Sequence, residues 1–147
     1  MAIAVALVFV GIQFIRPAMS NPPIDESKTI QAKMSVPPDV DKILARSCND
    51  CHTNNTNWVW YSNIAPGSWR MAHHVDEGRL ELNFSEYGNY SPKKAAHKLE
   101  EVCEQVKIGE MPLWDYVLLH PSARLSDADK ETLCNWANAE LGKIEVK

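Results

Sequence analysis

Two cysteines and a histidine stand close together in residues 48–52, which read CNDCH. Cysteines at this spacing can each form a thioether bond to one vinyl group of a porphyrin, and the histidine that directly follows is then held beneath the iron. The motif therefore predicts covalent attachment of one haem c. Cys48 and Cys51 would be the thioether residues, and His52 would be the proximal axial ligand.

A Cys-x-x-Cys pair has two other common uses, as a redox dithiol or as part of a zinc site. A redox dithiol of the thioredoxin type is expected after an apolar strand, whereas the residues before Cys48 have helical spacing. A zinc site needs two further ligands at comparable spacing, and Cys103 and Cys134 each stand alone. Haem attachment is the favoured interpretation, and a surface dithiol is the main alternative.

A haem that transfers electrons also needs a second strong axial ligand, and Met111 is the best candidate. It follows a helix-ending glycine and precedes Pro112, which keeps the loop from continuing as a helix. His74 is the alternative, because a histidine that faces inward from a helix over 69–77 would give bis-histidine ligation. The weaker candidates are Met71, His73, His97 and His120.

The elements that must position these residues are predicted to be helices. Apolar residues recur at helical spacing over 40–47, directly before the haem motif. The longest predicted helix begins with Ser91 and Pro92, a cap followed by a proline in the first turn, and ends at Gly109.

Two further helices complete the predicted domain. A short helix over 69–77 is expected to end at Gly78. The last helix follows Ser126, which forms a capping-box-like start with Asp129, and stops at Gly142. We find no internal repeat and no pair of strands, so the predicted fold class is all-α.

Aromatic residues follow the haem motif in a polar loop without periodicity. Trp58, Trp60 and Tyr61 are either walls of the haem pocket or ordinary core aromatics. Their proximity to the motif favours pocket walls.

The remaining two cysteines and the charge of the chain bear on its compartment and partners. Haem attachment of this kind requires export, and disulfides persist in exported proteins. Cys103 and Cys134 each lie on the apolar face of a predicted helix, so a disulfide and a pair of buried free thiols both remain open. The formal charge of -4 and the absence of a basic stripe argue against nucleic acid as a partner.

The first forty residues differ in composition from the rest. Residues 2–15 are almost wholly apolar, but at about 1.5 Å per residue they reach roughly 21 Å, short of the ~30 Å hydrocarbon core of a bilayer. We expect 1–16 to be an uncleaved membrane anchor whose true start lies a few residues upstream, or a signal segment. The proline-rich stretch 17–38 is expected to be an extended linker, and 39–147 to form the haem-binding domain.

From about residue 42 to residue 137 the chain resembles the bacterial haem-binding-domain family, whose members are small single-haem proteins, frequently with an N-terminal membrane segment. The matching text is CNDCHTNNTNWVWYSNIAP, then HVDEGRLELNFSEY, then KKAAHKLEEVCEQVKIGEMPLWDYVLLHPSARLS. The resemblance implies a cytochrome-c-like fold wrapped round one covalent haem, with Cys48, Cys51 and His52 in the roles given above and Met111 as the distal ligand. It implies no particular partner or reaction.

These observations together predict a single-haem c-type cytochrome with His52/Met111 ligation. We expect it to carry electrons between redox partner proteins, in the periplasm or at the membrane surface. The alternative is a haem-based sensor or a binder of diatomic ligands, which would need a weak or displaceable sixth ligand. We do not expect an enzyme. A peroxidase-like reaction needs an open distal face with an acid/base residue, and a sixth ligand supplied by the protein leaves no position for peroxide.

Overall fold

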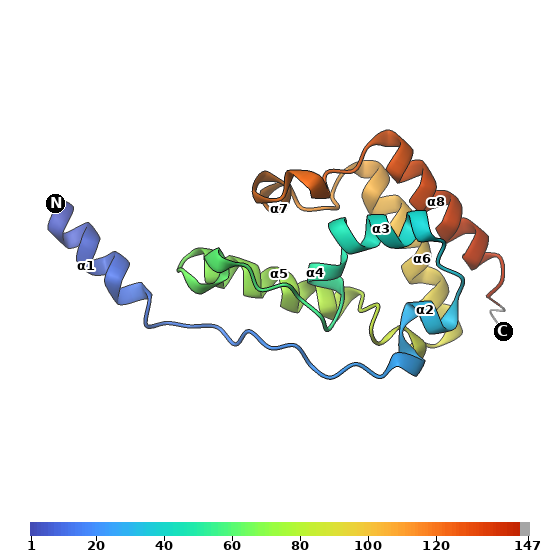
Figure 1. Cartoon of the computed structure of the whole chain (residues 1–147), viewed down its shortest axis with the longest axis horizontal. Coiled ribbons are helices and arrows are strands. Elements are labelled where there is room, and N and C mark those ends of the chain that lie inside the picture. The colour runs from blue at the N-terminus through green and yellow to red at the C-terminus, as the bar shows by residue number, and fades with distance from the viewer. Residues whose placement is uncertain (145–147) are drawn as a thin grey trace.

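The computed structural model describes residues 1–144, so residues 145–147 of the predicted domain lie outside the described residues. Over 1–144 the chain forms eight α-helices and no strand, which confirms the all-α prediction (Figure 1). The helices are α1 (Ala2–Ile12), α2 (Ile30–Lys33), α3 (Pro38–Ser47), α4 (Asn49–His52), α5 (Gly67–Glu81), α6 (Pro92–Ile108), α7 (Trp114–Leu119) and α8 (Asp127–Leu141).

The core lies where α3, α6 and α8 meet. Each of these helices contributes side chains that are almost completely buried, among them Leu44 from α3, Leu99 from α6 and Leu133 from α8. A disulfide between Cys103 and Cys134 joins α6 to α8. Of the two states that the sequence left open for these cysteines, the structure therefore contains the disulfide.

The predicted ends of α6 and the predicted start of α8 are confirmed. The Ser91 hydroxyl accepts a hydrogen bond from the Lys94 N–H, and Gly109 ends α6 in the left-handed conformation with φ of 81°. Such a conformation costs glycine no steric penalty. At α8, Ser126 and Asp129 form a complete capping box.

The prediction for α5 was wrong about its length and about the role of Gly78. The helix runs to Glu81, so Gly78 lies inside it and does not end it. A Cβ atom at Gly78 would lie 2.6 Å from the carbonyl oxygen of Cys51. Glycine is needed here because α5 crosses the backbone of α4 at this point, a tertiary reason that the local sequence does not reveal.

The stretch predicted as a linker is only partly extended. It contains a short 3₁₀ turn and α2, whose Ile30 is fully buried in the core. The Ile30 N–H donates to the Phe84 carbonyl over 2.8 Å, and the Trp136 indole N–H donates to the Ser35 carbonyl over 2.9 Å. The packed part of the chain therefore begins before residue 39, where the sequence places the start of the domain.

The apolar N-terminal segment forms α1, which lies beside the domain as a separate helix (Figure 1). None of its side chains is buried. Among the described helices, none is both long enough and apolar enough to cross a membrane. The role of residues 1–16 as an anchor or signal segment stays a prediction.

Candidate functional site

The CNDCH motif forms a single helical turn directly after α3, and its last four residues are α4. The N–H groups of Cys51 and His52 both donate to the Cys48 carbonyl, over 3.1 and 3.0 Å. Residues three and four positions apart lie on the same face of a helix. One turn therefore presents both thiols and the imidazole to the same side.

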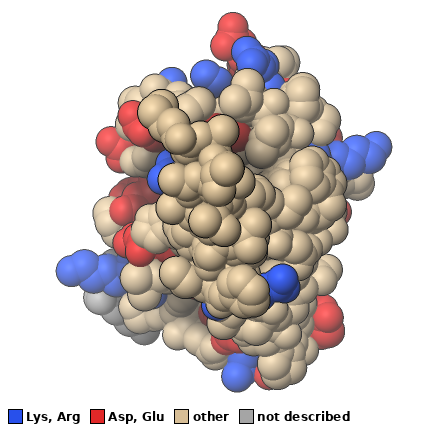
Figure 2. Space-filling view, turned by 90° about the vertical axis from the view of Figure 1, so that its left-hand side faces the viewer, with Lys and Arg blue, Asp and Glu red and all other residues tan. Residues whose placement is uncertain are grey.

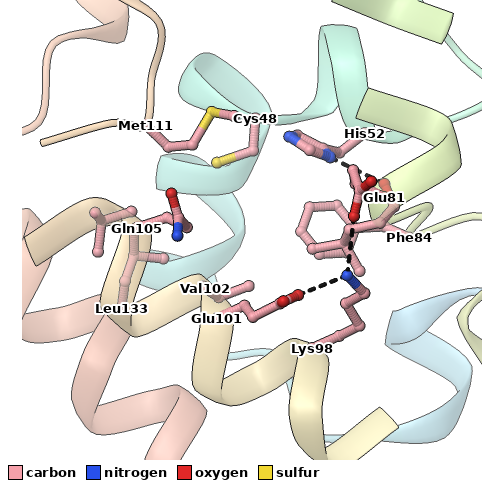
Figure 3. Close-up of a pocket in the computed structure, with 12 residues that line it drawn as sticks. Cys48, His52, Glu81, Phe84, Lys98, Glu101, Val102, Gln105, Met111 and Leu133 are labelled. Atoms are coloured by element: carbon pink, nitrogen blue, oxygen red, sulfur yellow. Dashed lines mark hydrogen bonds and ion pairs between the residues drawn. The ribbon is translucent and has the colours of Figure 1, made fainter. Parts of the chain in front are cut away.

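Two neighbouring cavities open on this side, with volumes of about 280 and 360 Å³. Both are lined by Cys48, His52, Glu81 and Met111, while Cys51 lines only the larger one. Figure 3 shows Met111 and Cys48 together at one side of the smaller cavity and the His52 ring at the other. Their combined size lies within the ~300 to 1,000 Å³ of ligand pockets.

The orientation of the His52 ring is fixed by two backbone carbonyls of the α5 region. Its Nδ1 lies 2.9 Å from the Leu82 oxygen and 3.0 Å from the Gly78 oxygen. Because carbonyl oxygens only accept, Nδ1 carries the proton and Nε2 keeps its lone pair, as in a metal-binding histidine. Burial lowers the pKa of His52, against the opposing effect of the two carbonyls, and this favours the neutral form that can bind iron.

The thiols of Cys48 and Cys51 are both free in the structure. Burial is the main cause that raises the pKa of each to about 12, helped by the neighbouring Cys51 and Asp50 respectively. A redox dithiol needs a lowered thiol pKa, so the dithiol alternative is disfavoured. In the described part of the chain no three His, Cys, Asp or Glu side chains are grouped so that they could hold a metal ion.

Met111 reaches the cavities from the loop that follows α6. After Gly109 turns the chain, the N–H groups of Glu110 and Met111 both donate to the Gln105 carbonyl, over 3.1 and 3.2 Å. These bonds fold the loop back onto the end of α6. The Met111 thioether is thereby held at the boundary of both cavities, beside Cys48 (Figure 3).

His74, the alternative ligand, lines the larger cavity but is already paired. Its Nε2 lies 3.0 Å from Oδ2 of Asp115, and the Arg70 Nε donates to the same oxygen over 2.7 Å. Burial alone would raise the pKa of Asp115, but the hydrogen bonds from Arg70 and His74 outweigh it and lower that pKa. The ionised carboxylate favours keeping the His74 imidazole where it is.

The weaker candidates are further removed from the motif. His73 is exposed and lines only the larger cavity, and Met71 is buried in α5 without lining either one. His97 is exposed on α6 beside two glutamates. His120 lies 2.5 Å from the Tyr61 hydroxyl and stacks on the Tyr116 ring. Of all the candidate residues, the structure brings only Cys48, His52 and Met111 to both cavities.

The walls of the smaller cavity include residues that sequence reasoning did not single out. Phe84, Val102, Val106 and Leu133 supply apolar surface, and Lys98 bonds Glu81 and Glu101 at the cavity edge (Figure 3). The helical stripe of apolar residues in α6 was a usable signal for the two valines. Phe84 lies in an irregular stretch and had none.

The aromatic residues after the motif do not form these walls. Trp58, Trp60 and Tyr61 line neither of the two cavities at the motif, so the pocket-wall interpretation was wrong. Tyr116 of α7 lines the larger cavity instead, and its hydroxyl donates to Asp50 over 2.7 Å. Burial and this hydrogen bond both raise the pKa of Tyr116, which therefore stays protonated.

The residues present fit a haem group. Apolar walls, two protonated thiols on one helical turn, an imidazole with a free Nε2 and a thioether that lines the same cavity match the donors that hold haem in proteins. No curated protein and no solved structure matches the chain. Residues 7–139, however, match the family described as haem-binding domain. Because this match covers most of the sequence, the chain belongs to the haem-binding domain family.

Proposed function

We propose that this haem-binding domain is a single-haem c-type cytochrome that carries electrons between redox partner proteins. The observation that carries the proposal is the meeting of the CNDCH turn and Met111 at the same two cavities. Cys48 and Cys51 would form the thioethers, and His52 and Met111 would be the axial ligands. When bound, the haem supplies a one-electron iron couple.

The protein's part in this function is to hold the two axial donors and to keep water away. The Gly78 and Leu82 carbonyls hold the His52 ring by Nδ1, which keeps Nε2 available and raises its basicity. The Gln105 carbonyl holds the loop that carries Met111. The apolar wall of α6 and Phe84 surrounds the cavity with low-polarity surface, and such burial is one of the factors that set a haem potential.

Methionine is preferred over His74 as the distal ligand because His74 would have to leave Asp115. The Asp115 carboxylate would then lose one of its two side-chain partners in a partly buried site. Met111 has no such competing bond through its thioether and lines both cavities. Methionine ligation would also give a higher potential than two histidines.

Covalent attachment is tested by removing the two thiols of the motif. In Cys48→Ala with Cys51→Ala, we expect the exported protein to lose haem staining on a denaturing gel, because no thioether remains. The matched control is Cys103→Ala with Cys134→Ala, which removes the other cysteine pair and should keep the stain. Haem that stays on the chain without Cys48 and Cys51 would disprove c-type attachment.

Attachment of haem c also implies a place for the protein. We propose that the domain lies on the periplasmic side and is tethered to the inner membrane by residues 1–16, or is soluble there if that segment is cleaved. The apolar α1 with its exposed side chains supports a tether. Fractionation of cells that make the full chain, with and without alkaline washing of the membranes, distinguishes the two forms.

A further inference from the structure

Large apolar side chains are exposed at one end of the folded domain. Trp60 belongs to the turn η2 (Trp60–Asn63), and Ile64 directly follows that turn. Three further exposed apolar residues belong to α7. Trp60 and Trp114 are each 75% exposed. The exposed members of α7 are Trp114, Leu118 and Leu119, and no residue of that helix is buried. Exposed apolar groups gathered in this way mark interaction sites.

The two elements that carry these side chains are attached to each other. The Tyr61 hydroxyl lies 2.5 Å from Nε2 of His120, the residue after α7. The His120 ring in turn stacks on Tyr116 at 4.2 Å between ring centroids. Tyr61 and Leu119 also line one small cavity between α5 and α7. The η2 turn and α7 therefore form one end of the molecule.

The apolar helix α1 is fixed to the same end. The Gln13 side chain donates to the Ala65 carbonyl over 3.1 Å and accepts from the Ala65 N–H over 2.8 Å. The Trp69 indole N–H donates to the Ile15 carbonyl over 2.7 Å. Figure 1 shows the C-terminal end of α1 near the left-hand end of α5, and Figure 2 shows uncharged residues across the middle of this end with charged ones at the rim.

We propose that this end of the domain, made by Trp60, Ile64 and the exposed residues of α7, docks on a lipid surface together with α1. A helix that is apolar on every side is stable in lipid or in a core, and α1 has no core around it. Because hydrogen bonds of Gln13 and Ile15 hold the end of α1 next to Ala65 and Trp69, a bilayer that receives α1 would also meet the apolar side chains of this end. Tryptophan is favoured at the boundary between lipid and water.

The inference extends the proposed tether to the folded domain and does not depend on haem. The formal charge of -4 gives no attraction to anionic lipids, so the contact must come from apolar burial. Vesicles of neutral phosphatidylcholine should therefore suffice. Binding should persist in about 1 M salt, where the electrostatic screening length falls to about 3 Å.

The test measures how the full chain partitions onto phosphatidylcholine vesicles in a flotation gradient. We expect Trp114→Ser with Leu118→Ser to lower the partition coefficient about tenfold or more, because two large apolar groups no longer enter the lipid. Leu80→Ser is the matched control. Leu80 is 72% exposed on the same fold but lies near the other end of α5, about 20 Å along the helix from Gly67. This control should leave partition unchanged.

A second variant pair separates the docking face from the tether. Val5→Glu with Val8→Glu places charges on exposed positions of α1 and should abolish most binding if α1 enters lipid. Loss of binding in the α1 variant but full binding in the α7 variant would overturn the docking face and leave the tether intact. Sedimentation without lipid tests whether this face binds a second copy of the chain instead. If the wild type is a dimer, and Trp114→Ser with Leu118→Ser makes it monomeric without changing its partition onto vesicles, the face binds a second copy and the inference is overturned.

Discussion

Met111 is the residue on which the proposed iron ligation depends most, since it is held by a loop and not by a helix. The loop is anchored through backbone bonds to Gln105 and leaves the Met111 thioether at the boundary of both cavities. His52, by contrast, is oriented by two carbonyls from another helix. A change at Met111 should therefore be the more informative test of the proposed ligation.

We predict that Met111→Ala opens one coordination position. The reduced protein should bind carbon monoxide, the spectrum should become partly high-spin, and the reduction potential should fall as a weaker ligand replaces the thioether. Met71→Ala is the control, because Met71 is also a methionine but is buried and lines neither cavity at the motif. It should cost about 2 to 5 kcal/mol of stability without changing the spectrum. If His74→Ala produces the open iron while Met111→Ala stays low-spin, His74 is the distal ligand.

The residues of the site that sequence could predict are those joined by short spacing. Cys48, Cys51 and His52 lie on one helical turn, so the local sequence is enough to predict that they act together. Met111 was predicted from the glycine before it and the proline after it, and its role as a ligand stays a prediction. The Gly78 carbonyl that orients His52 comes from 26 residues away, and its position depends on how α5 crosses α4. The local sequence does not predict where these two helices cross.

Among the elements, α4 and α5 make the closest contact around the motif. Gly78 lies where a Cβ would come within 2.6 Å of the Cys51 oxygen and 2.9 Å of the Cys51 Cβ. The same segment of α5 supplies the carbonyl groups that hold His52. Separation of the two helices would therefore disturb both the turn that carries Cys48 and Cys51 and the orientation of His52.

We predict that Gly78→Ala destabilises the protein by about 1 to 3 kcal/mol, because an added methyl group must push α5 away from α4. Urea unfolding gives the free energy, and the fraction of chain that carries haem gives the effect on the site. Gly142→Ala is the control, since a Cβ there meets only atoms at 3.7 Å or more in a right-handed conformation. It should be neutral or slightly stabilising. Equal stability of the two variants would mean that α5 can move away from α4 at no cost.

The helices that sequence predicted best are those whose ends carry their own signals. α6 and α8 begin with side-chain caps, and their bounds follow from Ser91, Gly109 and Ser126. α2 was missed because it has four residues and no side-chain cap hydrogen bond, and it is stabilised by the burial of Ile30. Such a short helix is not stable by itself, so only the tertiary structure shows it.

At the scale of the whole molecule, the cavity walls come from helices distant in sequence and are joined by one cross-link. α6 and α8 contribute Val102 and Leu133 to the smaller cavity, and the disulfide links the residues next to them, Cys103 and Cys134. The 31-residue separation between the two cysteines includes Met111 and α7. The cross-link therefore closes the part of the chain that would carry the distal ligand.

We predict that Cys103→Ala with Cys134→Ala lowers the free energy of unfolding by about 3 to 4 kcal/mol, the amount expected for releasing a loop of this length in the unfolded chain. Urea unfolding should be followed with the haem iron reduced in every sample, with and without a thiol reductant. The reductant should lower the stability of the wild type towards that of the variant and leave the variant unchanged, which separates the cross-link from any packing lost with the two sulfur atoms. The opposite result would be a wild type whose stability does not change with the reductant and whose Cys103 and Cys134 thiols can both be titrated after unfolding without reductant. It would show that the two cysteines are free and that packing alone holds α6 against α8.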